Sequence, residues 1–350
     1  MIGNRKADHV EIASEKDVNT HYNYWDDIIL IHNTMPEINY DEISTETYFF
    51  RKYLKYPIII ESMTGGFPEA RNINETLAKV ASELQIGMGV GSQRILLKNK
   101  DILDTFSVVR NYDIPLRIAN IGAPQLIDQR SEKAVTDEEI SYIINSLDAH
   151  FLNIHFNFLQ EVVQPEGDKK AKGVEQRLRE VCYKFPVIAK ETGAGMDFNV
   201  ALRLKRVGVK AIDISGVSGT SFSAVEYYRA KLMNDRIRER LGLTFWDWGI
   251  PSPYSVISTK NVGLKIIASG GIRNGLDIVR ALTLGADLVG MAGHVLKFAK
   301  QGYKPLLDEM SVIIEEMKAA MFLTGSKSIE SLKNKNYLII GKLREWMENK

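Results

Sequence analysis

The stretch IIASGGIRNGLDIV, residues 266–279, decides the fold because it holds one complete strand-to-helix unit. Its apolar start predicts a buried strand, its Gly-Gly pair predicts a tight turn, and NGLDIV begins an amphipathic helix. The residues LVGMAGHVLKFA (288–299) repeat this pattern directly afterwards. Two such units in succession predict parallel strands that are joined by crossover helices.

Similar β-rich runs recur along the chain, with amphipathic segments such as 69–84 and 274–285 between them. Near-continuous apolar strands that alternate with helices indicate a parallel sheet buried on both faces. Eight such units in 350 residues predict an α/β protein with a (β/α)8 TIM barrel rather than an open doubly wound sheet. The predicted strands are 56–62, 85–91, 114–120, 151–157, 185–191, 208–215, 263–269 and 285–291.

Three segments lie outside the regular alternation. Residues 1–55 form an N-terminal extension, the barrel is expected over 56–320, and 321–350 is expected to be a C-terminal helical segment. A long insertion, 221–253, follows the sixth strand. Insertions of this length are typical of a lid or an assembly surface, and the sequence leaves both open.

Composition excludes several classes of protein. The chain is 45% hydrophobic and 25% charged, with 45 basic and 44 acidic residues, so no strong field favours nucleic acid or a membrane surface. Cys182 is the single cysteine, which rules out an intrachain disulfide and a cysteine metal cluster. The N-terminus lacks the apolar core of a signal peptide, and no stretch is long enough to span a bilayer. We therefore expect a cytoplasmic protein.

Glycines and hydrogen-bonding side chains gather where the predicted strands end, which is the working face of such a barrel. The Gly-Gly turn after strand seven and the glycine turn after strand eight direct backbone N–H groups toward one point, with Arg273 beside the first. A single turn of this kind is equally well explained by the need for a tight bend. Two adjacent turns favour a phosphate site.

Lys190 ends the fifth predicted strand, within FPVIAKETGAG. Together with a phosphate site, and with the backbone of 62–64 near a ring edge, it would suit flavin mononucleotide (FMN). A surface pair of Lys190 with Glu191 is the structural alternative, and the apolar surroundings disfavour it. A Schiff-base nucleophile, as in barrel aldolases, remains a chemical alternative.

The fourth strand ends in HFNFLQEVVQPEGD (155–168), a dense polar run. Glu161 is the best candidate for a Mg²⁺ ligand, with Glu166 and Asp168 behind it, because this ion takes few carboxylates and completes its shell with phosphate and water. Gln160 is neutral, so it would orient a substrate or relay a proton. His155 could be a base, a phosphate donor or a hydrogen-bonded structural residue, and a lone histidine favours the structural role.

Near the N-terminus, NRKADHVEIA brings together Arg5, Lys6 and His9, which could neutralise a diphosphate. By composition alone, such a segment is more often a frayed, solvated terminus.

These motifs resemble one family. NRKADH, SMTGG, GSQR, NIGAPQ, HFNFLQEVVQPEGD, DISGVSGTSF and ASGGIRNGLDIVRALTLGAD are similar, in this order, to type 2 isopentenyl-diphosphate isomerase. The resemblance runs from about residue 4 to the end of the barrel. It implies a cytoplasmic, flavin-dependent (β/α)8 barrel that assembles as a homotetramer or homo-octamer.

The resemblance also implies a function in isoprenoid biosynthesis. The family interconverts isopentenyl and dimethylallyl diphosphate with FMN, Mg²⁺ and NADPH, which reduces the flavin and is not consumed stoichiometrically. His155, Asn157 and Gln160 would line the substrate pocket and act with reduced FMN, and Glu161 would hold the metal. The diphosphate would meet Arg5, Lys6, His9, Ser92, Gln93 and Arg94. The flavin would contact Ser62, Met63, Thr64, Ser92, Asn120, Lys190, Thr220, Gly271, Ile272, Arg273, Ala292 and Gly293.

Two departures from the family pattern stand out. Phe156 and Phe158 replace the family's usual Leu and Pro, and Phe158 is expected to reshape the wall near the prenyl chain. AKETGAG is a looser match to the family's strand-five loop. The alternatives are an FMN-dependent dehydrogenase or oxidase of a hydroxy acid, and a non-catalytic flavin-binding protein.

Overall fold

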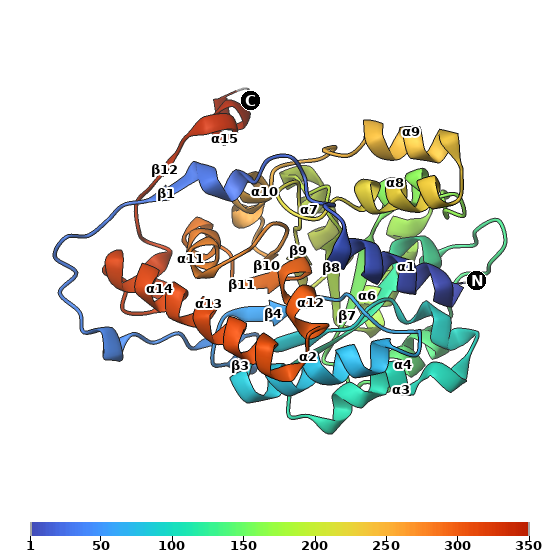
Figure 1. The fold of residues 1–350 in the computed structure, drawn as a ribbon, viewed down its shortest axis with the longest axis horizontal. Coiled ribbons are helices and arrows are strands. Elements are labelled where there is room, and N and C mark those ends of the chain that lie inside the picture. Colours follow the sequence, from blue (N-terminus) through green and yellow to red (C-terminus); the bar gives the residue numbers. More distant parts are fainter. Residues whose placement is uncertain (1, 349–350) are drawn as a thin grey trace.

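A closed barrel of eight parallel strands forms the centre of the computed structural model, which describes residues 2–348 and the side chains of residues 5–348 (Figure 1). This confirms the predicted (β/α)8 TIM barrel, and every predicted run overlaps one observed strand. Around the barrel the strands are β4 (Ile58–Ile60), β5 (Gly87–Gly89), β6 (Leu116–Gly122), β7 (Phe151–Phe156), β8 (Val187–Glu191), β9 (Ala211–Asp213), β10 (Lys265–Ala268) and β11 (Leu288–Met291), which pairs with β4.

Helices surround this barrel, as the amphipathic segments predict. The two segments quoted as examples, 69–84 and 274–285, are helical over Ala70–Leu84 and Gly275–Leu284. The region after β5 holds only short helical turns, including α3 (Asp104–Ser107). The larger outer helices are α2 (Ala70–Leu84), α4 (Asp137–Asn145), α6 (Val174–Lys184), α7 (Phe198–Val207), α10 (Ser252–Thr259), α11 (Gly275–Leu284) and α13 (Tyr303–Leu323).

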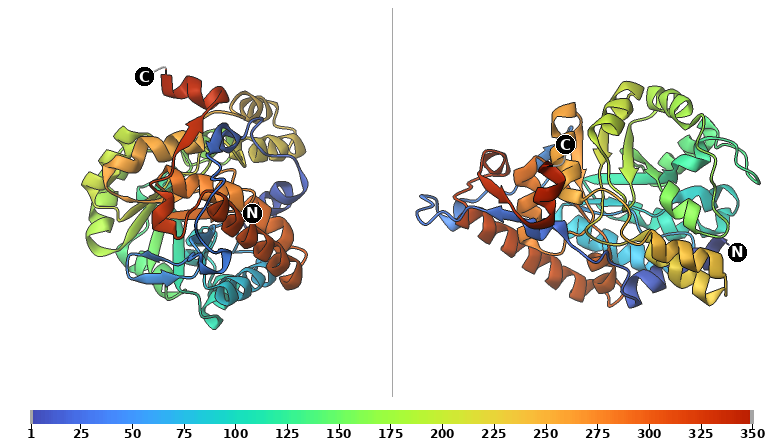
Figure 2. Two further views of the ribbon diagram at one scale, coloured as in Figure 1. Left: turned by 90° about the vertical axis from the view of Figure 1, so that its left-hand side faces the viewer. Right: turned by 90° about the horizontal axis from the view of Figure 1, so that it is seen from above.

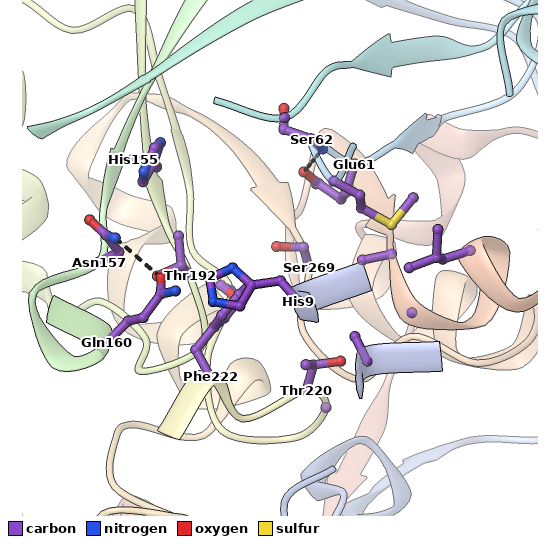
Figure 3. Close-up of a pocket in the computed structure, with 18 of the residues that line it drawn as sticks. His9, Glu61, Ser62, His155, Asn157, Gln160, Thr192, Thr220, Phe222 and Ser269 are labelled. Carbon is purple, nitrogen blue, oxygen red and sulfur yellow. Dashed lines mark hydrogen bonds between the residues drawn. The ribbon is translucent and has the colours of Figure 1, made fainter. Parts of the chain in front are cut away.

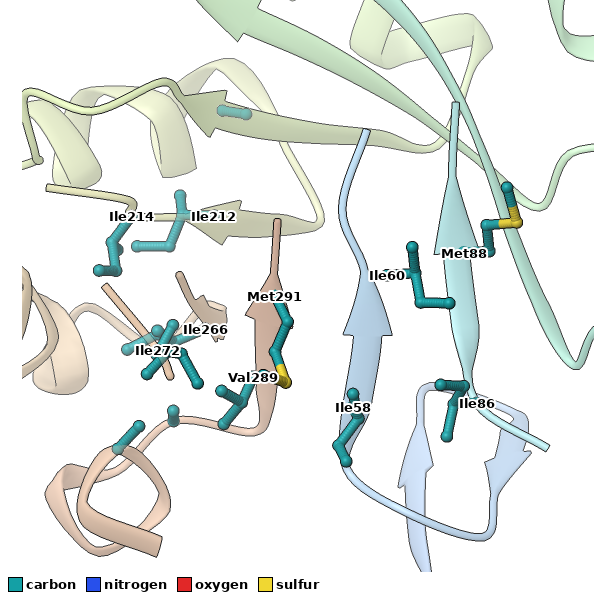
Figure 4. Packing of buried hydrophobic residues seen from close by; sticks show 14 of the residues in the cluster. Ile58, Ile60, Ile86, Met88, Ile212, Ile214, Ile266, Ile272, Val289 and Met291 are labelled. Atoms are coloured by element: carbon teal, nitrogen blue, oxygen red, sulfur yellow. The ribbon is translucent and has the colours of Figure 1, made fainter. Parts of the chain in front are cut away.

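The core has two layers, because successive strand residues face opposite sides of the sheet. Ile58 and Ile60 belong to the large cluster between strands and helices (Figure 4). Ile59 lies between them in a separate cluster inside the barrel. The hairpin of β2 (Thr47–Phe49) and β3 (Lys52–Leu54) adds Phe49 to this inner cluster, where its ring lies 5.8 Å from that of Phe151 at the start of β7. The N-terminal extension therefore covers the floor of the barrel.

The insertion after β9 folds into a pair of helices, α8 (Phe222–Leu232) and α9 (Arg236–Thr244). The first helix of the chain, α1 (Ile2–Glu15), lies beside α8 across the C-terminal side of the barrel (Figure 1). Two short helices, α5 (Phe158–Val163) and α12 (Gly293–Ala299), follow β7 and β11.

A segment that follows α1 pairs with a segment near the C-terminus at the side of the barrel. β1 (Ile28–Leu30) pairs antiparallel with β12 (Tyr337–Ile339), and Figure 2 shows the two segments side by side. The buried carboxylate of Asp27 accepts a hydrogen bond from the backbone N–H of Leu343 at 2.8 Å. Leu343 lies in α15 (Gly341–Glu348), and α14 (Ile329–Leu332) precedes β12.

Candidate active site

A cavity of about 620 Å³ opens at the C-terminal ends of the barrel strands. Strand ends, α1 and the loop that leads into α8 all contribute to its lining, as His9, Thr220 and Phe222 show in Figure 3. The strand ends of a (β/α)8 barrel are where its chemistry is placed. The cavity is therefore the candidate active site.

The inner face of the barrel changes from apolar to polar beneath this cavity. Ile59 and Ile188 point inward at the lower level, so the strand period of two also directs Glu61 and Lys190 inward, one level higher. The same step along the other strands brings further polar side chains to this level. They are Asn120, Asn153, Asp213 and Ser269.

Lys190 lies at the centre of a buried ionic cluster. Its Nζ is 2.7 Å from Glu61 Oε2 and 2.5 Å from Asp213 Oδ2, and Ser269 Oγ donates to Asp213 Oδ1 at 2.5 Å. Burial alone would lower the pKa of Lys190, but the charges of Asp213 and Glu61 outweigh it and raise the pKa above its usual value. A raised pKa keeps the amine protonated and without a free lone pair, which disfavours the Schiff-base alternative.

The surface-pair alternative for Lys190 is wrong. Lys190 is buried, and the neighbouring Glu191 carboxylate instead accepts hydrogen bonds from three backbone N–H groups of its own loop. The apolar surroundings in the sequence had indicated this burial.

His155 is held as a neutral imidazole. Asn120 Nδ2 donates to the carbonyl of Val90 at 3.0 Å, so Asn120 Oδ1 is the acceptor that faces His155 Nδ1 at 2.8 Å. Burial and then the charge of Lys190 lower the pKa of His155 to about 3. His155 therefore donates through Nδ1 and keeps Nε2 as an acceptor, and it carries no charge at neutral pH.

Gln160 is fixed at both ends of its amide. Its Nε2 donates to Glu226 Oε1 at 3.0 Å, and its Oε1 accepts from Asn157 Nδ2 at 3.2 Å (Figure 3). One N–H and one lone pair of this amide remain for a ligand. The Gln160 side chain is thus oriented before anything binds.

Glu161 lies among several oxygen atoms. Its Oε1 accepts from Asn157 at 2.9 Å, and its Oε2 accepts from Gln164 Nε2 at 2.5 Å and from the Asp168 N–H at 2.7 Å. Two buried oxygens on the same side chains, Asn157 Oδ1 and Gln164 Oε1, have no hydrogen-bond partner in the described structure. Within residues 2–348, no three His, Cys, Asp or Glu side chains form a ready metal cluster. The available donors are hard oxygens, which suit Mg²⁺.

The basic residues near the N-terminus lie on α1 and line the cavity, so they do not form a frayed, solvated terminus. Lys6 Nζ donates to the carbonyl of Gly65 at 2.9 Å and to that of Ser92. Burial and then the nearby charge of Arg5 lower the pKa of Lys6 to about 7. An anion in this cavity would restore the full charge of Lys6.

Glu226 of α8 is a site residue that the sequence analysis missed. This fully buried carboxylate accepts from His9 Nε2 at 2.8 Å, from Gln160 Nε2 at 3.0 Å and from Arg229 Nη1 at 2.6 Å. Burial alone would raise its pKa, but His9 and then Arg229 lower the pKa of Glu226 to about 2. The ionised Glu226 therefore joins α1, α5 and the insertion.

Arg229 extends this connection. Its Nη2 donates to Glu166 at 2.9 Å, which ties α8 to the polar run after β7. The one signal in the sequence was an acidic and a basic residue three positions apart within the apolar segment SAVEYYRA.

The glycine turn after β10 requires glycine at Gly271. Its φ is +86°, and a Cβ there would lie 2.1 Å from the carbonyl oxygen of Ser218. The backbone of this turn lines the cavity together with the turn after β11. The two predicted glycine turns therefore face one space.

The guanidinium of Arg273 is already balanced by carboxylates. Arg273 Nη2 lies 2.6 Å from Asp26, and its Nε lies 2.9 Å from Asp277. These hydrogen bonds raise the pKa of Arg273 above its usual value. The charge of Arg273 is thus less available to a phosphate than the sequence suggested.

Two predicted contact residues have side chains that point elsewhere. Thr64 Oγ1 donates to Asn74, and Gln93 is fully buried, donating to Ser146 Oγ at 2.8 Å and accepting from the Asn120 N–H at 3.0 Å. Neither lines the cavity. The remaining predicted residues do line it: Arg5, Lys6, His9, Ser62, Met63, Ser92, Arg94, Asn120, His155, Asn157, Gln160, Glu161, Lys190, Thr220, Gly271, Ile272, Arg273, Ala292 and Gly293.

Phe156 and Phe158 also lie away from this cavity. They line a second cavity of about 420 Å³ together with residues of α6 and α7. The expectation that Phe158 reshapes the wall near the substrate is therefore not met, because both rings pack on the outer side of β7.

Comparison with known proteins gives closely related full-length sequences. The chain is 48% identical over 348 residues to isopentenyl-diphosphate delta-isomerase of Picrophilus torridus, covering 99% of each chain. It is 49% identical over 350 residues to the protein of the same name from Thermoplasma acidophilum, covering 100% of each. Residues 249–339 match the family model of FMN-dependent dehydrogenases.

Solved structures with the same fold include two oxidases at 14% identity. A mandelate oxidase with an FMN adduct aligns over 95% of this chain and 92% of its own, with a TM-score of 0.61. A lactate oxidase of Pediococcus acidilactici aligns over 95% and 87%, with a TM-score of 0.63.

The helices and the sequence comparisons together indicate the class of protein. None of the helices in the described part of the chain combines the length and apolarity that a membrane crossing needs. The sequences of these two isomerases are almost half identical to this chain over nearly their full length, which shows common ancestry. The match to the family model of FMN-dependent dehydrogenases and the barrel fold agree with that ancestry. The chain belongs to the isopentenyl-diphosphate delta-isomerase family, in its FMN-dependent type 2 form.

Proposed function

We propose that this protein interconverts isopentenyl diphosphate and dimethylallyl diphosphate, with reduced FMN, Mg²⁺ and NADPH as the reductant of the flavin. Relatives almost half identical over their full length bear the isomerase name. The observation that carries the proposal is one cavity that combines buried cationic side chains, a carboxylate among free oxygens and the glycine turns of a phosphate site.

The residues present fit FMN. The turn at Gly271, which can pack against Ser218 only without a Cβ, lines the cavity, and the ammonium of Lys190 stands on the cavity wall as a positive charge. Bound and reduced, FMN would supply an acid/base nitrogen and an electron-rich face for a carbocation-like transition state. The residues that would hold it are Ser62, Met63, Ser92, Asn120, Lys190, Thr220, Gly271, Ile272, Arg273, Ala292 and Gly293.

The diphosphate would be held by α1 and by Glu161. Lys6, Arg5 and His9 bring positive charge to the same side of the cavity, and Ser92 and Arg94 face it from the β5 loop. Glu161 would hold Mg²⁺, whose remaining ligands would be diphosphate and water. Gln93 would act indirectly, by holding the backbone of Asn120.

Gln160 would position the alkene and relay a proton. A neutral amide is a weak base, so Gln160 would pass a proton between hydrogen-bond partners rather than keep it. Glu226 would set its orientation from behind, and Asn157 from the side. His155, as a neutral donor and acceptor, would line the pocket. Exclusion of water once substrate fills the cavity would protect a cationic transition state.

An anaerobic assay with FMN, Mg²⁺, NADPH and isopentenyl diphosphate tests this proposal. We expect dimethylallyl diphosphate to form only after the flavin is reduced, without matching consumption of NADPH. Gln160→Ala should lose turnover while it still binds FMN, Mg²⁺ and substrate. Full turnover by this variant would remove the role proposed for Gln160.

The second candidate is an FMN-dependent dehydrogenase or oxidase, which the match over 249–339 and the fold of the two oxidases favour. Bound, reducible flavin without isomerisation, but with net oxidation of lactate or mandelate, would establish it.

The proposal extends to a cytoplasmic homotetramer or homo-octamer. Light scattering on the purified, flavin-loaded protein would measure the assembly state.

A further inference from the structure

Glu61 is a buried acid in the active-site cavity to which the proposed isomerisation gives no role. It follows β4, is 5% exposed, and lines the cavity next to Ser62 (Figure 3). The strand period of two directs it inward above Ile59. Its carboxyl group therefore faces the barrel axis directly beneath the proposed flavin site.

The fold reserves space for this carboxyl group. A Cβ at Gly290 of the adjacent β11 would lie 1.8 Å from Glu61 Oε1, so glycine is required beside it. Glu61 Oε2 lies 2.7 Å from Lys190 Nζ, whereas Oε1 is buried and has no hydrogen-bond partner in the described structure. An unpartnered buried carboxylate oxygen is costly, and a proton on it reduces that cost.

The charges around Glu61 do not balance when all groups are ionised. Lys190 from β8 is one ammonium between two carboxylates, Glu61 and Asp213 of β9. Ser269 of β10 donates a hydrogen bond but carries no charge, and His155 of β7 is neutral. The other strands present asparagines and glycines to this level: Gly89, Asn120, Asn153 and Gly290. The cluster therefore has one excess negative charge in a buried place.

The proton affinity of Glu61 agrees with this imbalance. Burial and then the charge of Asp213 raise its pKa to about 7, although Lys190 acts in the opposite direction. A small increase in nearby negative charge is enough to protonate such a group at neutral pH.

We propose that Glu61 is a positioning residue that binds one proton from solvent when the flavin in the cavity is reduced. This inference rests on the proposed function, because it requires FMN in this cavity. Reduction by the nicotinamide transfers two electrons and one proton to the flavin, oxidises the nicotinamide and leaves one additional negative charge on the flavin. The proton on Glu61 compensates that charge. Lys190 then keeps Asp213 as its carboxylate partner, and its ammonium still lines the cavity.

The pH dependence of the flavin midpoint potential tests the proposal. Each proton taken up with two electrons contributes about 30 mV per pH unit. Near pH 8, we expect the potential of the wild-type holoprotein to fall about 30 mV per pH unit more steeply than that of Glu61→Gln. Glu191→Gln is the matched control, because Glu191 is also a buried acid whose pKa burial raises to about 7, yet it lies outside the cluster. Its slope should equal the wild-type slope.

Infrared difference spectra of the photoreduced wild-type protein give an independent measure that needs no variant. We expect a C=O band of a protonated carboxyl to appear on reduction and to shift in D2O. Asp213→Asn, which removes the like charge, should weaken the extra slope even if Glu61→Gln does not fold.

Each outcome has a distinct meaning. Equal slopes for wild type and Glu61→Gln, or no carboxyl band in the wild type, would overturn the role of Glu61 and leave the isomerase proposal intact. Absence of bound flavin, seen directly in the absorbance spectrum, would overturn both.

Discussion

Replacing Glu226 with Gln would remove a buried charge while nearly preserving the shape of the side chain. Glu226 accepts hydrogen bonds from His9, Gln160 and Arg229, and the surroundings lower its pKa from 4.5 to about 2. A shift of this size corresponds to about 3 kcal/mol in favour of the ionised form in the folded protein. We therefore expect Glu226→Gln to lose on the order of 3 kcal/mol of unfolding free energy at pH 7.

The sign of the pH dependence follows from the lowered pKa. The stabilisation by Glu226 is complete above pH 4.5, where the unfolded chain is also ionised, and is lost as the pH falls toward 2. The difference between wild type and variant should shrink to about half by pH 3. Urea denaturation of the flavin-free proteins at several pH values measures it.

Glu330→Gln is the matched control for this experiment. Glu330 is 82% exposed and lies 3.6 Å from Lys333, so its loss should change stability by less than about 0.5 kcal/mol. In turnover, Glu226→Gln should lower kcat on the order of 100-fold, because Gln160 loses its orientation. A stability difference below about 1 kcal/mol, or one that does not change with pH, would refute the reasoning.

Three further predictions concern ligands. Burial and Arg5 lower the pKa of Lys6 to about 7. On binding inorganic diphosphate, the wild type should therefore take up close to one proton more than Lys6→Met at pH 8 and little more at pH 6, as measured by calorimetry in buffers of different ionisation enthalpy; equal uptake by the two proteins at pH 8 would contradict this. Glu161→Gln should weaken Mg²⁺ binding at least 10-fold in the presence of diphosphate, while flavin absorbance stays unchanged; equal Mg²⁺ affinity would contradict the metal assignment. Gly271→Ala would place a Cβ 2.1 Å from the oxygen of Ser218, so the purified variant should retain little FMN, and a wild-type flavin content would exclude a cofactor role for this turn.

The barrel was predictable because each strand is a short apolar run that a glycine-rich turn follows. The same regularity places Glu61 on the inner face of the barrel, because it lies two residues after Ile59, a member of the inner core cluster. In the loops no such period exists. Motif membership alone could not tell that Gln93 points into the protein while its neighbours Ser92 and Arg94 face the cavity.

Glu226 could not be assigned from the sequence for a different reason. It lies 217 positions from His9 and 66 from Gln160, and these contacts depend on how the insertion packs over the barrel. The sequence pattern around Glu226 predicts a helix, but it does not predict which distant residues the helix contacts. The sequence likewise predicted that the charge of Arg273 would be available to a phosphate. Asp26, which balances this charge, lies far away in the sequence, in the N-terminal extension.

The pairing of β1 with β12 has a consequence for synthesis of the chain. Ile28 pairs with Ile339, and the carboxylate of Asp27 accepts from the backbone of Leu343. A growing chain that has already released its barrel strands from the ribosome still lacks these partners, since domains form in the order in which they emerge. The barrel nevertheless already anchors the segment that follows α1, because Trp25 Nε1 donates to the carbonyl of Gly270 and Asp26 pairs with Arg273. The last residues would thus add β12 and α15 to a segment that the completed barrel already holds in place.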